Sequence, residues 1–211
     1  MNKNENKGET GEETEDEFKV ILVGEIGTGK TSLINAAIGL QFQDQMVSTT
    51  TNSIMNKIMN IDGKSYSINL WDTIGQEKYR SLTKIFMKDA NIIIFVYDIT
   101  QLKSFQELNF WFEFSKDIIS EDAVVAVVGN KSDLYMNEVV KEEDARKLAK
   151  DFKYEFELTS AKTPAIFCKF LEKLVYKYIQ RKKEMNKETE KKSEKIKKEK
   201  IKDKLKPKCC N

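Results

Sequence analysis

The sequence lacks the features of a membrane-spanning or secreted protein. None of its apolar runs reaches the roughly 20 residues that a transmembrane helix needs, and its N-terminus has no signal peptide. Its three cysteines do not make a disulfide framework, and Cys168, inside an apolar helical pattern, is most simply a small core residue. The chain also contains no internal repeat. We therefore expect a protein that is made and kept in the cytosol.

The two ends of the chain carry opposite charge, although the net charge is only +2. Residues 1–17 hold two Lys against seven Asp or Glu and have no apolar periodicity, so we expect a disordered acidic arm. Residues 181–208 hold fourteen Lys or Arg against six Asp or Glu without a sustained apolar face. A fraying helix and a disordered tail both fit that pattern. Residues 18–180 suit one domain.

The most informative stretch is residues 24–31, which read GEIGTGKT and fit the phosphate-loop pattern G-x-x-x-x-G-K-[ST] in full. A buried-strand pattern precedes it and a helical pattern follows it, so its backbone N–H groups and the helix N-terminus can hold a polyphosphate. Lys30 would reach the outer phosphates, and the Thr31 hydroxyl would ligate Mg²⁺. A plain glycine-rich turn is the alternative, which the full match and both flanks disfavour.

Strand and helix patterns alternate through residues 18–180, which predicts a doubly wound α/β fold with a six-stranded, mostly parallel sheet flanked by helices. The predicted strands are residues 18–23, 53–61, 64–71, 92–97, 123–128 and 154–158. The predicted helices are residues 32–40, a helix ending near residue 89, and residues 102–119, 142–152 and 162–180. Asp62-Gly63 predicts one antiparallel hairpin. Such a sheet binds its ligand beyond the strand ends.

The loop after residue 71 carries a second motif. Asp72, at the tip of an apolar strand, suits an indirect contact with Mg²⁺. Gly75 can offer its N–H to a terminal phosphate because no side chain blocks it, and Gln76 is an amide able to orient a water molecule. Alone these residues would usually be a turn, but after a phosphate loop the functional interpretation is favoured.

Two further segments suit recognition of a guanine base. The carboxylate of Asp133, in Asn130-Lys131-Ser132-Asp133, can accept two hydrogen bonds from the N1–H and N2–H₂ edge of guanine, which adenine lacks. Backbone N–H groups of residues 159–162 could meet the guanine O6. A surface turn and a plain helix start are the respective alternatives. Thr49 could give a second hydroxyl to Mg²⁺, although composition alone does not select it from residues 48–51.

These motifs together resemble a small GTPase of the Ras superfamily, and within it a Rab. The match covers residues 18–180 and is carried by GEIGTGKTS, WDTIGQEKYRSL, VYDIT, GNKSDL and TSAK, in the family's order and spacing. WDT-x-GQE and the terminal Cys-Cys favour Rab over Ras or Rho. The resemblance implies a GTP/GDP switch that uses Mg²⁺, hydrolyses GTP and recruits effectors to membranes in vesicle trafficking. A P-loop ATPase or kinase is disfavoured by Asp133.

By this resemblance Lys30 and Gln76 are catalytic, Phe42 stacks on the guanine, and Thr31, Thr49 and Asp72 serve the metal. Thr49 lies where the family's threonine lies, counted from Thr31 and from Asp62-Gly63. Switch I would span residues 42–54 and switch II residues 72–86, with Ile54, Trp71 and Phe86 as an apolar effector triad. The implied nucleotide-binding residues are Glu25, Ile26, Gly27, Thr28, Gly29, Lys30, Thr31, Ser32, Phe42, Thr49, Gly75, Asn130, Lys131, Asp133, Ser160, Ala161 and Lys162.

The chain departs from the family in both switch regions. Residues 50–54 read TTNSI where Rabs usually have IGVDF, so the resemblance does not predict which effectors bind. Ile74 replaces a small residue beside the γ-phosphate, and Ile26 replaces the usual Ser or Gly of the phosphate loop. Both add bulk where a water and an activating protein's arginine must approach, so we expect slow hydrolysis. A GTP-holding module that hardly hydrolyses is the alternative.

The C-terminal segment, residues 181–211, resembles Rab tails. Cys209 and Cys210 do not form a C-a-a-X box, because Lys208 is fourth from the end, but they match Rab endings that take two geranylgeranyl groups. Two lipid chains suffice for stable anchoring. Interleaved Glu and the lack of aromatics disfavour nucleic acid as a partner. We expect a monomer on the cytoplasmic face of endomembranes, served by exchange, activating, effector and prenyl-chaperone proteins.

Overall fold

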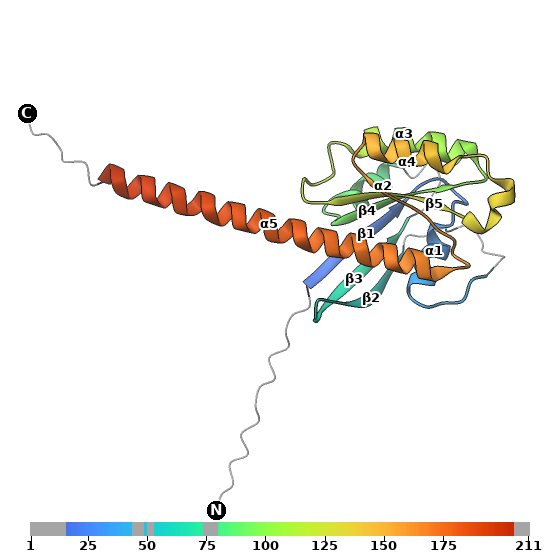
Figure 1. Cartoon of the computed structure of the whole chain (residues 1–211), viewed down its shortest axis with the longest axis horizontal. Coiled ribbons are helices and arrows are strands. Elements are labelled where there is room, and N and C mark those ends of the chain that lie inside the picture. The colour runs from blue at the N-terminus through green and yellow to red at the C-terminus, as the bar shows by residue number, and fades with distance from the viewer. Residues whose placement is uncertain (1–15, 44–48, 50–52, 74–79, 205–211) are drawn as a thin grey trace, which may run out of the picture.

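The computed structural model describes residues 16–43, 49, 53–73 and 80–204. A six-stranded sheet in the order β2-β3-β1-β4-β5-β6 forms its centre, with helices on both faces (Figure 1). The elements in chain order are β1 Asp16–Val23, α1 Lys30–Ala37, β2 Ser53–Ile61, β3 Lys64–Asp72, α2 Arg80–Met87, β4 Ile92–Asp98, α3 Leu102–Ser115, β5 Val124–Asn130, the 3₁₀ helix η2 Ser132–Asn137, α4 Glu142–Asp151, β6 Glu155–Leu158 and α5 Pro164–Lys204. The predicted fold class is confirmed.

The β2–β3 hairpin is the one antiparallel pairing in the described sheet, and the other neighbours run parallel. Its turn residues Asp62 and Gly63 both have positive φ, at 52° and 79°. That conformation suits a two-residue turn that follows the twist of the strands, and Asp-Gly is a preferred sequence for it. The predicted hairpin is therefore present at the predicted residues.

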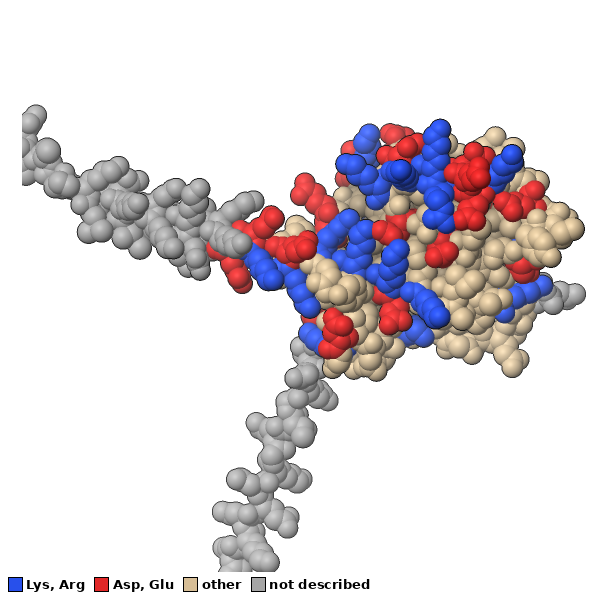
Figure 2. Space-filling model, viewed as in Figure 1, with Lys and Arg blue, Asp and Glu red and all other residues tan. Residues whose placement is uncertain are grey.

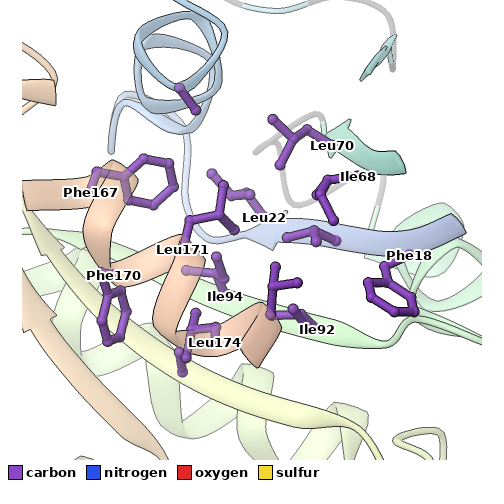
Figure 3. Packing of buried hydrophobic residues seen from close by; sticks show 14 of the residues in the cluster. Phe18, Leu22, Ile68, Leu70, Ile92, Ile94, Phe167, Phe170, Leu171 and Leu174 are labelled. Atoms are coloured by element: carbon purple, nitrogen blue, oxygen red, sulfur yellow. The ribbon is translucent and has the colours of Figure 1, made fainter. Parts of the chain in front are cut away.

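Side chains alternate across β1 and so fill two cores, one on each face of the sheet. Phe18, Val20 and Leu22 face α1 and α5, where they pack with residues such as Leu171 (Figure 3). Ile21 and Val23 face the opposite layer, which α2, α3 and α4 complete. Because both faces are covered, the central strands are continuous apolar runs, as expected for parallel strands in an α/β sheet.

Helix α5 continues far past the predicted end at residue 180. It remains helical to Lys204 and projects beyond the sheet (Figure 1). No glycine or proline occurs from residue 165 to residue 206, and Lys and Glu are good helix formers, so nothing in this stretch stops the helix. The two alternatives for residues 181–208 were a helix and a disordered tail. The residues of this segment that the structure describes, 181–204, are helical.

Charges of both signs are mixed on the face of the domain that Figure 2 shows, and over the first exposed turns of the α5 projection. On α5, Lys173 and Lys177 both pair with Glu155 of β6. Within the described part of the chain, no helix combines the length and apolarity that crossing a bilayer requires.

Candidate functional site

A cavity of about 370 Å³ opens beyond the carboxyl ends of the central strands. Its size lies within the range of small-molecule pockets. Segments from the loops after β1, β3, β5 and β6 meet there, although they are far apart in the chain. The lining residues are Ile26, Gly27, Gly29, Lys30, Thr31, Ser32, Phe42, Gln43, Thr49, Thr73, Asn130, Lys131, Asp133, Leu134, Ser160, Ala161 and Lys162. The separate sequence motifs therefore build one site.

Most of the predicted nucleotide-binding residues line this cavity, and three residues that were not predicted join them. The additions are Gln43, Thr73 and Leu134, each next to a predicted residue or segment. Thr73 fastens its loop to β1, because its hydroxyl donates to the Leu22 carbonyl at 2.6 Å. Their position beside the recognised motifs was the one indication that the sequence offered.

Glu25 and Thr28 belong to the phosphate loop but do not line the cavity. Thr28 shapes the phosphate loop from within, because its hydroxyl donates to the Glu25 carbonyl at 2.9 Å. Ile74, Gly75 and Gln76 lie outside the described residues, as do Cys209 and Cys210. Their predicted roles stay predictions.

The phosphate loop is tied to the end of β5 by Asn130. The Asn130 Nδ2 donates to the Thr28 carbonyl at 2.8 Å. A Cβ at Gly29 would lie 2.3 Å from that same nitrogen, and Gly29 has a φ of 89°. Only glycine fits this position without a shift of the loop or of Asn130. The loop and the strand therefore form one rigid wall of the cavity.

Lys30 is buried at the start of α1, with 5% of its surface exposed. Its Nζ donates to the carbonyls of Gly24 and Glu25, each at 2.9 Å. Burial lowers the pKa of Lys30 to about 8, against an opposing pull from Asp72 and Glu25. A buried ammonium held mainly by neutral carbonyls is poorly compensated. An anionic ligand such as a polyphosphate would supply the missing negative charge.

Three oxygens meet beside Lys30 in a cluster formed by Thr31, Thr49 and Asp72. The Thr31 Oγ1 donates to Asp72 Oδ2 at 2.7 Å and lies 2.7 Å from Thr49 Oγ1. Since the single proton of Thr31 goes to Asp72, the Thr49 hydroxyl is the donor to Thr31. Burial raises the pKa of Asp72, although its hydrogen bond from Thr31 and the charge of Lys30 oppose the rise.

This oxygen cluster fits a hard divalent cation. Asp72 Oδ1 is buried and has no hydrogen-bond partner among the described residues. Mg²⁺ prefers oxygen ligands and is usually held by one or two carboxylates together with substrate phosphates. Two hydroxyls and one carboxylate next to the Lys30 phosphate position match that chemistry.

The far end of the cavity joins Asp133 to the segment after β6. Ser160 Oγ donates to Asp133 Oδ1 at 2.6 Å, and Lys162 Nζ lies 3.7 Å from Asp133 Oδ2. The same Lys162 Nζ lies 5.2 Å from the centre of the Phe42 ring. A carboxylate acceptor and an aromatic ring are thus placed together, which suits a planar base that carries N–H donors.

None of the three residues of the predicted effector triad lines the cavity. Ile54 of β2 is paired with Trp71 of β3 in the sheet register, and the Trp71 and Phe86 rings are 5.6 Å apart. Ile54 is 54% exposed. Ile54 is therefore exposed beside the partly buried Trp71–Phe86 pair, and the role of these residues in effector binding stays a prediction.

Comparison with known proteins agrees with this geometry. The model of the Ras family matches residues 19–180. Ras-related protein Rab-26 from Mus musculus is 38% identical over 157 residues, which cover 74% of this chain and 60% of that protein. Ras-related protein Rab-37 from Homo sapiens is 35% identical over 146 residues, covering 69% of this chain and 66% of that protein. The chain spans about three fifths of the length of the Rab-26 relatives.

Proposed function

The chain is a Rab-like member of the Ras family of small GTPases, and from this premise we propose that it is a GTP/GDP switch. In this proposal it binds GTP with Mg²⁺, hydrolyses it to GDP, and in the GTP form recruits effectors to membranes in vesicle trafficking. The observation that carries the proposal is the cavity, which unites the phosphate loop, the oxygen cluster and Asp133.

The phosphate loop supports the binding step. Lys30 would exchange its two carbonyl contacts for the β and γ phosphates, while the loop N–H groups surround the phosphate oxygens. Asp133 would accept from the N1–H and N2–H₂ groups of guanine, and Phe42 would stack on the ring. Adenine lacks this pair of donors, so Asp133 disfavours a P-loop ATPase or kinase.

The metal belongs to the same proposal. Thr31 and Thr49 would turn their hydroxyl lone pairs to Mg²⁺, with Asp72 behind them. Thr31, Thr49 and Asp72 would hold the metal, which would supply positive charge to stabilise the transferred phosphoryl group. Thr49 lies in the predicted switch I. The presence or absence of the γ-phosphate would therefore affect the conformation of switch I through this residue.

Hydrolysis is proposed to rest on Gln76, which would orient the attacking water. Ile26 lines the cavity and is 44% exposed, so its branched side chain occupies space at the phosphate end. That observation favours the second candidate function, a module that holds GTP and cycles slowly. Phosphoryl transfer depends on positioning, so crowding here acts on the rate more than on affinity.

Membrane attachment is proposed to use lipids on Cys209 and Cys210. The preceding helix α5, with its mixed Lys and Glu, would link the domain to those lipids. Exchange, activating and prenyl-chaperone proteins, together with effectors at Ile54, Trp71 and Phe86, are the expected partners.

Single-turnover hydrolysis of GTP by the full chain, with and without lysate of its own cell type, separates the two candidates. A switch hydrolyses GTP faster when the lysate supplies an activating protein. A slow module gives the same rate in both conditions. Absence of any bound guanine nucleotide in the presence of Mg²⁺ would contradict both.

A further inference from the structure

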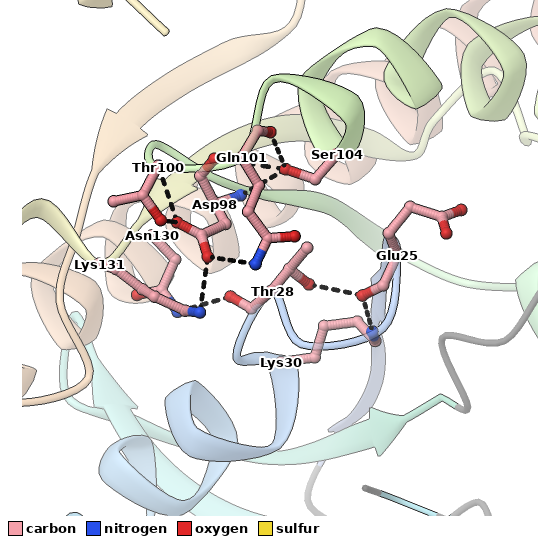
Figure 4. Close-up of polar contacts among 9 residues, drawn as sticks. All are labelled: Glu25, Thr28, Lys30, Asp98, Thr100, Gln101, Ser104, Asn130 and Lys131. Carbon is pink, nitrogen blue, oxygen red and sulfur yellow. Dashed lines mark hydrogen bonds and ion pairs between the residues drawn. The ribbon is translucent and has the colours of Figure 1, made fainter. Parts of the chain in front are cut away.

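Asp98 is a buried carboxylate at the end of β4, inside the VYDIT motif, and the sequence alone assigns it no role. Its exposed fraction is 0%, and four donors surround it (Figure 4). Oδ1 accepts from the Thr100 backbone N–H at 2.8 Å and from the Thr100 hydroxyl at 2.7 Å. Oδ2 accepts from Gln101 Nε2 at 3.2 Å and pairs with Lys131 Nζ at 2.6 Å. The carboxylate therefore has a full set of partners, of which one belongs to the nucleotide cavity.

Lys131 enters this pair from an unusual backbone conformation. It follows β5 directly and has φ 66° and ψ 34°, a left-handed geometry that a residue with a Cβ seldom adopts. Such a conformation persists where surrounding contacts hold it in place. Strand register brings the partner close, because Asp98 is aligned with Asn130, the residue before Lys131. The pair therefore holds Lys131 at its ammonium end, while the strand register fixes the backbone of the preceding Asn130.

The pairing also sorts the charges at this end of the cavity. Two lysines, Lys131 and Lys162, and two carboxylates, Asp98 and Asp133, lie close together. The structure pairs Lys131 with Asp98 at 2.6 Å and leaves Asp133 with Ser160 and a looser contact to Lys162 at 3.7 Å. An ammonium freed from Asp98 would be able to compete for Asp133, two residues further along the chain.

We propose that Asp98 is a positioning residue for guanine nucleotide: it holds Lys131 along the cavity wall and keeps its ammonium away from Asp133. The proposal rests on the proposed function and extends it to a residue outside the cavity lining. The aliphatic stem of Lys131 then forms a preset side of the base pocket. Asp98 itself does not line the cavity, so its loss would act through Lys131.

A purely structural role for Asp98 makes a different prediction. Asp98 also fastens the turn between β4 and α3, where its backbone N–H donates to Ser104 Oγ at 3.0 Å and Ser104 Oγ donates to the Gln101 carbonyl at 2.7 Å. Thr100→Val removes one hydrogen bond from this turn and leaves the Lys131 pair intact. This variant is therefore the matched control for turn stability.

The test is the dissociation rate of a fluorescent GDP analogue from the full chain, chased with excess GDP in Mg²⁺. Asp98→Asn keeps the shape but turns an amide toward the ammonium, and Lys131→Met keeps the stem without the charge. Each variant loses a hydrogen bond between charged groups, so we expect the GDP analogue to dissociate about 10- to 100-fold faster than from wild type. The double variant should be no faster than the faster single variant, because both changes break one pair. Thr100→Val should stay within about threefold of wild type, whatever its melting temperature.

The inference is overturned if the rate increases of the two single variants multiply in the double variant. It is also overturned if Thr100→Val releases GDP as fast as Asp98→Asn does. Either result would assign Asp98 to turn stability. An unchanged rate in Asp98→Asn would overturn it too. If a single variant does not fold, the double variant, which removes both charges of the pair, still has to release GDP faster than wild type. Wild type that fails to bind the GDP analogue counts against the proposed function, whereas the comparison among variants tests Asp98 alone.

Discussion

The hydroxyl of Thr31, at the start of α1, lies 2.7 Å from the carboxylate of Asp72, 41 residues later at the end of β3. The Thr49 hydroxyl meets the same Thr31 oxygen. Three segments that are separate in sequence are thus joined at one point of the cavity. Under the proposed function, a metal held by Thr31 and Thr49 would link the bound nucleotide to Thr49 of the predicted switch I.

The metal role of Thr49 is tested by Thr49→Ala, with Thr49→Ser as the control that keeps the hydroxyl. Thr49→Ala should release GTP about tenfold faster in Mg²⁺, because one hydroxyl contact to a charged centre is lost. GDP release should change little in either variant. Stopped-flow release measured in Mg²⁺ and in EDTA checks this. If Thr50→Ala reproduced the effect and Thr49→Ala did not, the assigned threonine would be wrong by one position.

Base selection is tested by Asp133→Asn. The amide replaces one acceptor oxygen by a donor, so it opposes the guanine N2–H₂ group and favours xanthine, whose corresponding group is an acceptor. GTP affinity should fall and XTP affinity should rise, which reverses the wild-type preference. Competition titrations against a fluorescent GDP analogue measure both. Unchanged GTP affinity in the variant would remove Asp133 from the base site.

Crowding at the γ-phosphate is tested by Ile26→Ser and Ile74→Ala, singly and combined. Each change should raise the single-turnover rate of GTP hydrolysis, because it opens the approach for Gln76 and for an activating arginine. Leu40→Ser is the control, since Leu40 is exposed but does not line the cavity. Rates equal to wild type in all three test variants would show that the isoleucines do not limit hydrolysis.

Acid stability is tested at Glu155, which accepts from Lys173 Nζ at 2.8 Å and also pairs with Lys177. Burial alone would raise the pKa of Glu155, but the two lysines outweigh it and hold the pKa below the ordinary 4.5. The unfolded chain therefore binds the proton first as pH falls. The stabilisation is complete above pH 4.5 and is lost as pH falls through the lower, folded-state pKa.

Glu155→Gln should lower the free energy of unfolding near pH 7 by about 0.5–1 kcal/mol, discounted because the group is partly solvated. The gap from wild type should close in strongly acidic buffer. Urea unfolding across pH 7 to 3, with GDP and Mg²⁺ held constant, measures this difference in the free energy of unfolding. The control is Glu172→Gln, an exposed residue on α5, the helix that carries Lys173 and Lys177. A stability gap that is independent of pH would contradict the ion-pair account.

Much of the fold and site follows from local sequence patterns. Apolar patterns and the turn residues between them predict the six strands. The phosphate loop and Asp133 belong to motifs that are contiguous in sequence. The Asp98–Lys131 pair is not contiguous, and it becomes visible only when the register of β4 against β5 aligns Asp98 with Asn130. The sequence does not predict where α5 ends, because the charged composition of this segment suits a solvated tail and a single helix equally well.

The central claim is that the cavity binds guanine nucleotide, and equilibrium competition of GTP against ATP on the purified full chain in Mg²⁺ tests it most directly. A site built to hydrogen-bond one base rejects an analogue without those groups by about 10⁴–10⁵. The account predicts that GTP displaces a fluorescent GDP analogue at concentrations lower than ATP by a factor of that order. Equal displacement by the two nucleotides, or tighter binding of ATP, would contradict it.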